Sequence, residues 1–234
     1  MCVAAIAWQA DPRWPLLVIA NRDEFHHRPT APLARWDNGV IAGRDLRAGG
    51  TWLGAHDAGR FALVTNYRVE GYPRPDRQSR GALVTDWLER GDLVDGAAMN
   101  PFNLLVADST NARIVSNWPE LREQTLELGL HGLSNGAFDQ PWPKTQALCA
   151  ALDAWLKADA HHFAPLFAAL RDDAPMTGDG PEQRFSPVFI ADPTYGTRCS
   201  TVVAIRPDGS GIMVERSFDA AGQVTGERSE RLAS

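Results

Sequence analysis

The chain has 234 residues, a formal net charge of −6 and a hydrophobic fraction of 44%. An acidic chain lacks the basic surface that binds nucleic acid or an anionic membrane, so we expect neither partner. No apolar run approaches the roughly 20 residues of a membrane span, and the N-terminus lacks the basic start of a signal peptide. We therefore expect a cytoplasmic protein with three free thiols, at Cys2, Cys149 and Cys199.

Short apolar runs in the first third of the sequence predict strands. Val3–Trp8 and Leu16–Ala20 flank the polar turn Gln9–Pro15, a pattern typical of a hairpin. A loop is expected over Arg68–Gln78, which contains one glycine and two prolines. Further strands are expected before that loop, at Gly39–Ala42, Thr51–Gly54 and Arg60–Thr65.

The rest of the chain combines helices with more hairpins. One helix is expected from a cap at Ser79 to about Arg90, and apolar periodicity predicts two more at Pro143–Lys157 and His162–Leu170. Consecutive hairpins with added helices indicate an α+β fold with mostly antiparallel sheets, in a single domain over residues 1–234. The remaining strands are expected at Phe102–Ala107, Ala112–Asn117, Leu126–Leu133, Val188–Ala191, Cys199–Ile205, Gly211–Ser217 and Val224–Glu230.

Cys2 is the sharpest candidate for chemistry. An initiator methionine before a small residue is usually removed, which would leave Cys2 with a free α-amine beside its thiol. That amine has a pKa near about 8, so it can take the thiol proton at neutral pH and produce the attacking thiolate. The alternative interpretation is a small buried residue at the start of a strand.

Four polar residues, Asn21–Glu24, follow the second apolar strand. If the first two strands pair as a hairpin, this cluster arrives beside Cys2. Arg22 would then stabilise a thiolate, and Asp23 would accept a hydrogen bond from the α-ammonium group. The alternative is a capped turn with a surface salt bridge.

Other polar residues near strand ends allow more than one interpretation. Asn66 and Asn135 each follow a predicted strand, where an asparagine either donates to an oxyanion or fills a left-handed turn. Ser134 lies in a G-x-S-x-G pattern, but Pro141 and Pro143 follow where that motif requires a helix.

The sequence shows no spacing of metal ligands and no cofactor-binding motif, so we expect neither a metal nor a cofactor. Four tryptophans near predicted strand ends or loops would line an apolar pocket or pack in the core: Trp36, Trp52, Trp118 and Trp142.

Six motifs together resemble one known family. The chain resembles the NRDE family, that of the transport and Golgi organisation 2 protein, from its first residues to about Val203. That family is similar to cysteine-type N-terminal-nucleophile hydrolases, such as penicillin acylases and bile-salt hydrolases, which implies a four-layer αββα sandwich. The motifs are Met1-Cys2, Ala20–Phe25, Gly49–Gly54, Thr65–Arg68, Leu133–Gly136 and Tyr195–Arg198.

The same resemblance implies roles for individual side chains. Cys2 is implied as the nucleophile, Arg22 and Asp23 as the pair that flanks it, and Arg198 as a late arginine near it. The spacing of Arg22 and Asp23 differs from that in the acylases. The two asparagines of the oxyanion and substrate site are implied to be Asn66 and Asn135.

Two functions of different classes follow from these observations. The first is hydrolysis of a C–N amide bond in a small apolar or acyl substrate, through a thioester on Cys2 that water then hydrolyses. The second is a non-catalytic carrier or chaperone of haem or an acyl-lipid ligand, because members of the family are linked to lipid metabolism and haem trafficking. Whether Met1 is removed distinguishes the hydrolase from the carrier, since the amine-assisted mechanism requires Cys2 to become the first residue.

Overall fold

The computed structural model describes residues 2–158, 160–178 and 183–233. The first of its two sheets has six strands in the order β10-β1-β2-β11-β12-β13, and each neighbouring pair is antiparallel. Because β1 and β2 pair along their length, the predicted N-terminal hairpin is confirmed. The strands are β1 (Val3–Asp11), β2 (Trp14–Phe25), β10 (Gly129–Leu133), β11 (Tyr195–Ile205), β12 (Gly211–Phe218) and β13 (Val224–Leu232).

The second sheet has seven strands in simple sequence order, from β3 to β9, and is also antiparallel. Short turns connect most of its strands, which is why neighbours in sequence are neighbours in the sheet. Its strands are β3 (Thr30–Arg35), β4 (Val40–Asp45), β5 (Leu53–His56), β6 (Arg60–Asn66), β7 (Phe102–Ala107), β8 (Ala112–Ser116) and β9 (Arg122–Thr125).

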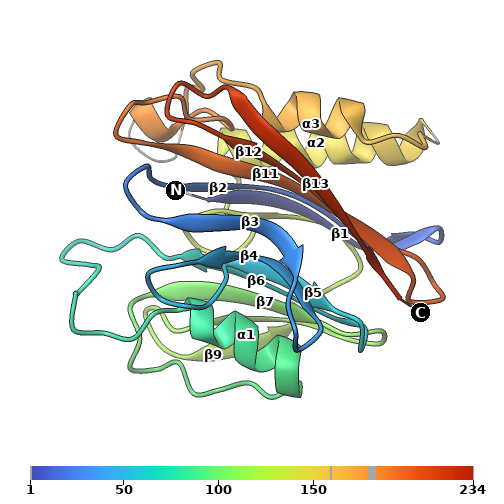
Figure 1. Ribbon diagram of the computed structural model, residues 1–234, viewed down its shortest axis with the longest axis horizontal. Coiled ribbons are helices and arrows are strands. Elements are labelled where there is room, and N and C mark those ends of the chain that lie inside the picture. The colour runs from blue at the N-terminus through green and yellow to red at the C-terminus, as the bar shows by residue number, and fades with distance from the viewer. Residues whose placement is uncertain (1, 159, 179–182, 234) are drawn as a thin grey trace.

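The two sheets face each other, and helices cover their outer faces (Figure 1). A core that includes Ile6, Phe61 and Leu105 lies between the sheets. A second core joins the six-stranded sheet to α2 (Pro143–Lys157) and α3 (Ala164–Leu170), and a third joins the seven-stranded sheet to α1 (Gly81–Arg90). Both faces of each sheet are therefore apolar, and the predicted α+β class and four-layer αββα arrangement are confirmed.

No helix in the described parts of the chain is long and apolar enough to cross a membrane.

Several details of the predicted elements are wrong. The prediction missed β3 and β9, because β9 is exposed at every position and β3 buries only Leu33, so neither shows the usual apolar alternation. The predicted strand at Val188–Ala191 does not form. Ile190 bonds to one residue of β11, Thr197, whose Oγ1 accepts the Ile190 N–H (2.9 Å) and whose N–H donates to the Ile190 carbonyl (2.9 Å), and the segment forms no ladder of backbone pairs. The N-cap of α1 is Arg80 and not Ser79.

Candidate active site

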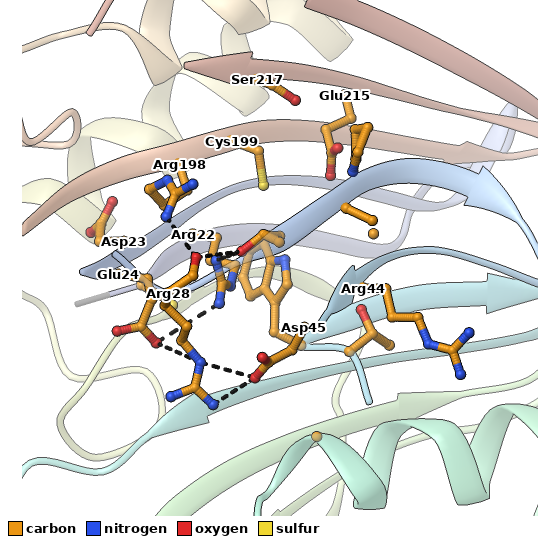
Figure 2. Close-up of a pocket in the computed structure, with 18 of the residues that line it drawn as sticks. Arg22, Asp23, Glu24, Arg28, Arg44, Asp45, Arg198, Cys199, Glu215 and Ser217 are labelled. Carbon is orange, nitrogen blue, oxygen red and sulfur yellow. Dashed lines mark hydrogen bonds and ion pairs between the residues drawn. The ribbon is translucent and has the colours of Figure 1, made fainter. Parts of the chain in front are cut away.

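The N-terminal hairpin and β11 bring Cys2 to one cavity. Val3 pairs with Asn21 across β1 and β2, and Arg22 pairs with Cys199 across β2 and β11. Cys2, one residue before Val3, therefore lies level with Arg22 and Cys199. All three line a cavity of about 430 Å³ that both sheets enclose, and Figure 2 shows Arg22 and Cys199 on its wall.

The Asn-Arg-Asp-Glu segment lies within β2 and not after it, which corrects the expected strand end. Successive side chains in a strand point to opposite faces, so the four residues divide into two pairs. Asn21 points toward the helix layer, where its Nδ2 donates to the carbonyls of Leu170 (2.7 Å) and Val188 (2.9 Å). Arg22 and Glu24 point into the cavity (Figure 2).

Arg22 brings a positive charge into the cavity wall. The residue is only 7% exposed, and its Nη1 donates to Thr30 Oγ1 at 3.3 Å. Its nearest carboxylate, on Glu24, is 3.8 Å away and also lies 3.8 Å from Arg28. Arg28 in turn pairs closely with Asp45 at 2.6 Å (Figure 2). Arg22 is therefore the less strongly paired of these two arginines.

The Cys2 thiol experiences opposing influences on its pKa. Burial raises that pKa, and the negative charge of Asp23 raises it further, whereas Arg22 and the backbone N–H of Asp23 lower it. Burial dominates, so the thiol is protonated at neutral pH in the resting protein. A base must therefore remove the proton before the sulfur can attack.

Asp23 lies next to Cys2 with little exposure to solvent. Its Oδ1 accepts a hydrogen bond from Thr197 Oγ1 at 2.7 Å, and its backbone carbonyl accepts one from the Tyr195 hydroxyl at 3.0 Å. Burial raises the pKa of the Asp23 carboxyl, whereas the nearby Lys144 lowers it. Asp23 is thus held in one orientation by β11.

The two predicted oxyanion asparagines lie side by side but differ in access to the cavity. Asn66, at the end of β6, lines the cavity and is exposed. Asn135 is 2% exposed, is not among the described residues that line the cavity, and donates its Nδ2 to the Asn66 carbonyl at 2.7 Å. Only Asn66 therefore has a side chain placed to reach a ligand, and Asn135 fixes the backbone beneath it.

Arg198 lines the cavity from β11. Its Nη1 donates to the carbonyls of Phe25 (3.1 Å), His26 (3.2 Å) and Arg28 (3.1 Å). These bonds hold the turn between β2 and β3 against the cavity. Its Nε is buried with no hydrogen-bond partner among the described residues.

Ser134 is not the nucleophile of a G-x-S-x-G motif but a residue that positions Cys2. Its Oγ donates to the carbonyl of Cys2 at 2.7 Å, and its own carbonyl accepts a hydrogen bond from Thr65 Oγ1 at 2.7 Å. The serine therefore anchors the backbone of Cys2 to β10. Sequence reasoning missed this role, because the contact joins residues that are 132 positions apart.

Lys144 is a second residue that the sequence prediction missed. It lies in the first turn of α2, is 1% exposed, and donates its Nζ to the Phe185 carbonyl at 3.1 Å. Burial lowers its pKa, whereas the charges of Asp23 and Cys2 raise it. A cation in the first turn opposes the helix dipole, and that mismatch was the signal available in the sequence.

We expect the Lys144→Met substitution to make Cys2 less reactive. Lys144 places a positive charge near Cys2. The other charged groups that act on Lys144 are the carboxylate of Asp23 and the guanidinium of Arg68. Removing that charge raises the pKa of the thiol, so the alkylation profile moves to higher pH and iodoacetamide reacts roughly five- to tenfold more slowly at pH 7. Lys144→Arg should retain the rate, as should Lys157→Met at the exposed end of α2. An identical pH profile for Lys144→Met would contradict this role.

The cavity is charged and not the apolar, tryptophan-lined pocket that we considered. Among the four tryptophans singled out from the sequence, only Trp52 lines it. In the described parts of the chain, no group of three or more His, Cys, Asp or Glu side chains could hold a metal ion. The charged lining residues are Arg22, Arg28, Arg44, Arg80, Arg198, Arg228, Asp23, Glu24, Asp45, Glu215 and Glu227.

The four layers, with a cysteine at the start of β1, define a fold of the N-terminal-nucleophile hydrolase class, and solved structures agree. The chain resembles a conjugated bile acid hydrolase from Clostridium perfringens at a TM-score of 0.58, with 11% identity and coverage of 98% and 92% of the two chains. A penicillin V acylase from Agrobacterium tumefaciens gives a TM-score of 0.51, with 13% identity and coverage of 99% and 91%. At such identities the likeness shows the fold alone.

The sequence comparisons show which family this is. The model of the family described as Transport and Golgi organisation 2 matches residues 1–220. The Transport and Golgi organization protein 2 homologs of Bos taurus and Homo sapiens are 33% and 31% identical to the chain, and each match covers 93% of both proteins. The chain therefore belongs to the Transport and Golgi organisation 2 family.

Proposed function

We propose that this protein hydrolyses a C–N amide bond with Cys2 as an N-terminal nucleophile. The observation that carries the proposal is that Cys2, at the start of β1, lines the same cavity as Arg22, Asp23, Asn66 and Arg198. Loss of Met1 would create an α-amine on Cys2 itself, beside the thiol that needs a base. The fold shared with known amidohydrolases supports the same reaction class.

In this mechanism the Cys2 α-amine takes the thiol proton, and the sulfur attacks the carbonyl carbon of the amide. Asn66 donates to the developing oxyanion, Arg22 stabilises the thiolate, and Asp23 holds the α-ammonium group. Collapse of the adduct breaks the C–N bond, and the ammonium group returns the proton to the leaving amine. Water then attacks the thioester, which releases the carboxylic acid and restores the thiol.

Processing of the N-terminus tests this proposal directly. We expect natively expressed protein to lack Met1 by intact mass, and iodoacetamide to alkylate Cys2 at least about tenfold faster than Cys149 or Cys199. Burial raises the pKa of all three thiols, that of Cys149 to about 11, but only Cys2 would gain an adjacent α-amine that takes the thiol proton. A retained methionine together with an inert Cys2 would refute the proposal.

A carrier of haem or an acyl-lipid ligand is the other function that the sequence suggested. The cavity offers little support for a purely apolar ligand, because charged side chains from both sheets line it.

We place the hydrolase in the cytoplasm, where a reducing environment would keep its cysteines free.

A further inference from the structure

The carboxylates that line the cavity are largely satisfied by partners of their own. Asp45 pairs with Arg28 at 2.6 Å, and Glu227 pairs with Arg216 at 2.6 Å. Glu215 accepts the backbone N–H of Leu33 at 2.7 Å, and burial raises the pKa of its carboxyl. These three acids therefore neutralise few of the other cations in the cavity. Glu24 is paired less tightly, at 3.8 Å from both Arg22 and Arg28, and its charge also acts on Arg80 and Arg198 without contacting either.

Four cavity arginines lack a carboxylate partner within 4.0 Å in the described parts of the chain, and they differ in burial: Arg44 and Arg228 are exposed, whereas Arg80 and Arg198 are partly buried. Arg80 donates its Nη1 to the Pro101 carbonyl at 3.0 Å, and burial lowers the pKa of its guanidinium to about 10. Among the described residues, the partners of Arg198 Nη1 are backbone carbonyls, and its buried Nε has no hydrogen-bond partner. Burying a guanidinium group without a carboxylate in contact is costly, so an anion that contacts both arginines would stabilise them.

The two arginines approach the cavity from opposite layers. Arg198 lies on β11 in the six-stranded sheet, and Arg80 is the N-cap of α1, which covers the seven-stranded sheet. Ser79 and Gly81, on either side of Arg80, also line the cavity, so the positive end of the α1 dipole adds to the field there. The first turn of α1 contains no acidic residue that would neutralise that end.

We infer that the substrate is an acyl amide that carries an anionic group, such as a carboxylate, phosphate or sulfonate, which Arg80 and Arg198 bind beside Cys2. The inference rests on the proposed function, since it assigns a ligand to the cavity of the same nucleophile. The sequence suggested a small apolar or acyl substrate, whereas this inference gives the substrate a charged group.

A matched pair of alkylating reagents tests this inference without knowledge of the substrate. Iodoacetate is anionic and iodoacetamide neutral, and both react with the thiolate of Cys2. The fraction of thiolate is common to both reagents, so it cancels when the two rate constants are divided. We expect the ratio of iodoacetate to iodoacetamide rates at Cys2 to exceed that of a small neutral thiol by about tenfold at low salt, and to fall in 0.5 M NaCl.

Charge variants identify the arginines responsible. Arg80→Gln and Arg198→Gln should each lower the rate ratio at least threefold, whereas Arg80→Lys, which retains the charge, should preserve most of it. Arg122→Gln is the matched control, because it removes one charge from a side chain that is 70% exposed on β9, outside the cavity. Arg198→Gln also loses three backbone contacts, so Arg80→Gln and Arg80→Lys decide the result if that variant does not fold.

The outcomes separate the two proposals. A ratio equal to that of the neutral thiol, or one unchanged in Arg80→Gln, would overturn the anionic substrate and leave the nucleophile intact. A Cys2 that reacts with neither reagent would overturn the proposed function and, with it, this inference.

Discussion

The Cys2→Ala substitution should abolish formation of an acyl-enzyme and lower amide hydrolysis at least about a thousandfold, because the other cysteine that lines the cavity, Cys199, has no α-amine beside it and burial holds the pKa of its thiol high. The measurement is intact mass after incubation with an activated acyl ester. The unsubstituted protein should gain one acyl group and lose it slowly to water, and Cys2→Ala should gain none.

Cys149→Ala is the control for that experiment. Cys149 is half-buried on α2, and burial raises the pKa of its thiol to about 11, so its loss should leave acylation unchanged. Acyl transfer that persists in Cys2→Ala and disappears in Cys149→Ala would show that the nucleophile has been assigned to the wrong cysteine.

The Asn21→Ala substitution should reduce the free energy of unfolding by about 3–5 kcal/mol. Asn21 is fully buried, donates to the carbonyls of Leu170 and Val188, and accepts from Ser200 Oγ at 2.6 Å. Alanine leaves these buried groups without partners and creates a void between β2 and the helix layer. Urea-induced unfolding followed by circular dichroism measures the loss.

Asn111→Ala is the matched control, because Asn111 is exposed and its Nδ2 donates to the neighbouring Thr110 Oγ1. Its cost should stay within about 0.5 kcal/mol. An Asn21→Ala variant as stable as Asn111→Ala would contradict a structural role for the first residue of the Asn-Arg-Asp-Glu segment.

The sequence predicted most elements, because their apolar periodicity is local information. The helix predicted at Pro143–Lys157 has those bounds in the structure, and the predicted N-terminal hairpin forms. Prediction failed where burial does not follow that periodicity. Val188–Ile190 is apolar and buried, yet it forms no strand: Ile190 bonds to β11 at Thr197, and the N–H of Phe189 donates to the Asp172 carbonyl, outside any strand.

The sequence by itself determined the α+β class, the cysteine at the start of the first strand and the polar segment that the hairpin brings near it, and its resemblance to a known family implied the four layers. Only the tertiary structure decided that Asn21 supports the helix layer while Arg22 faces the cavity, and that Lys144 and Ser134 belong to the surroundings of Cys2. It also showed a charged cavity where tryptophans had suggested an apolar one. The physical reason is that side chains alternate between the two faces of a sheet, so the face of each polar residue is known only when the strand is known to include it. A cavity wall, in turn, forms from contacts between segments far apart in the sequence, and local periodicity contains neither kind of information.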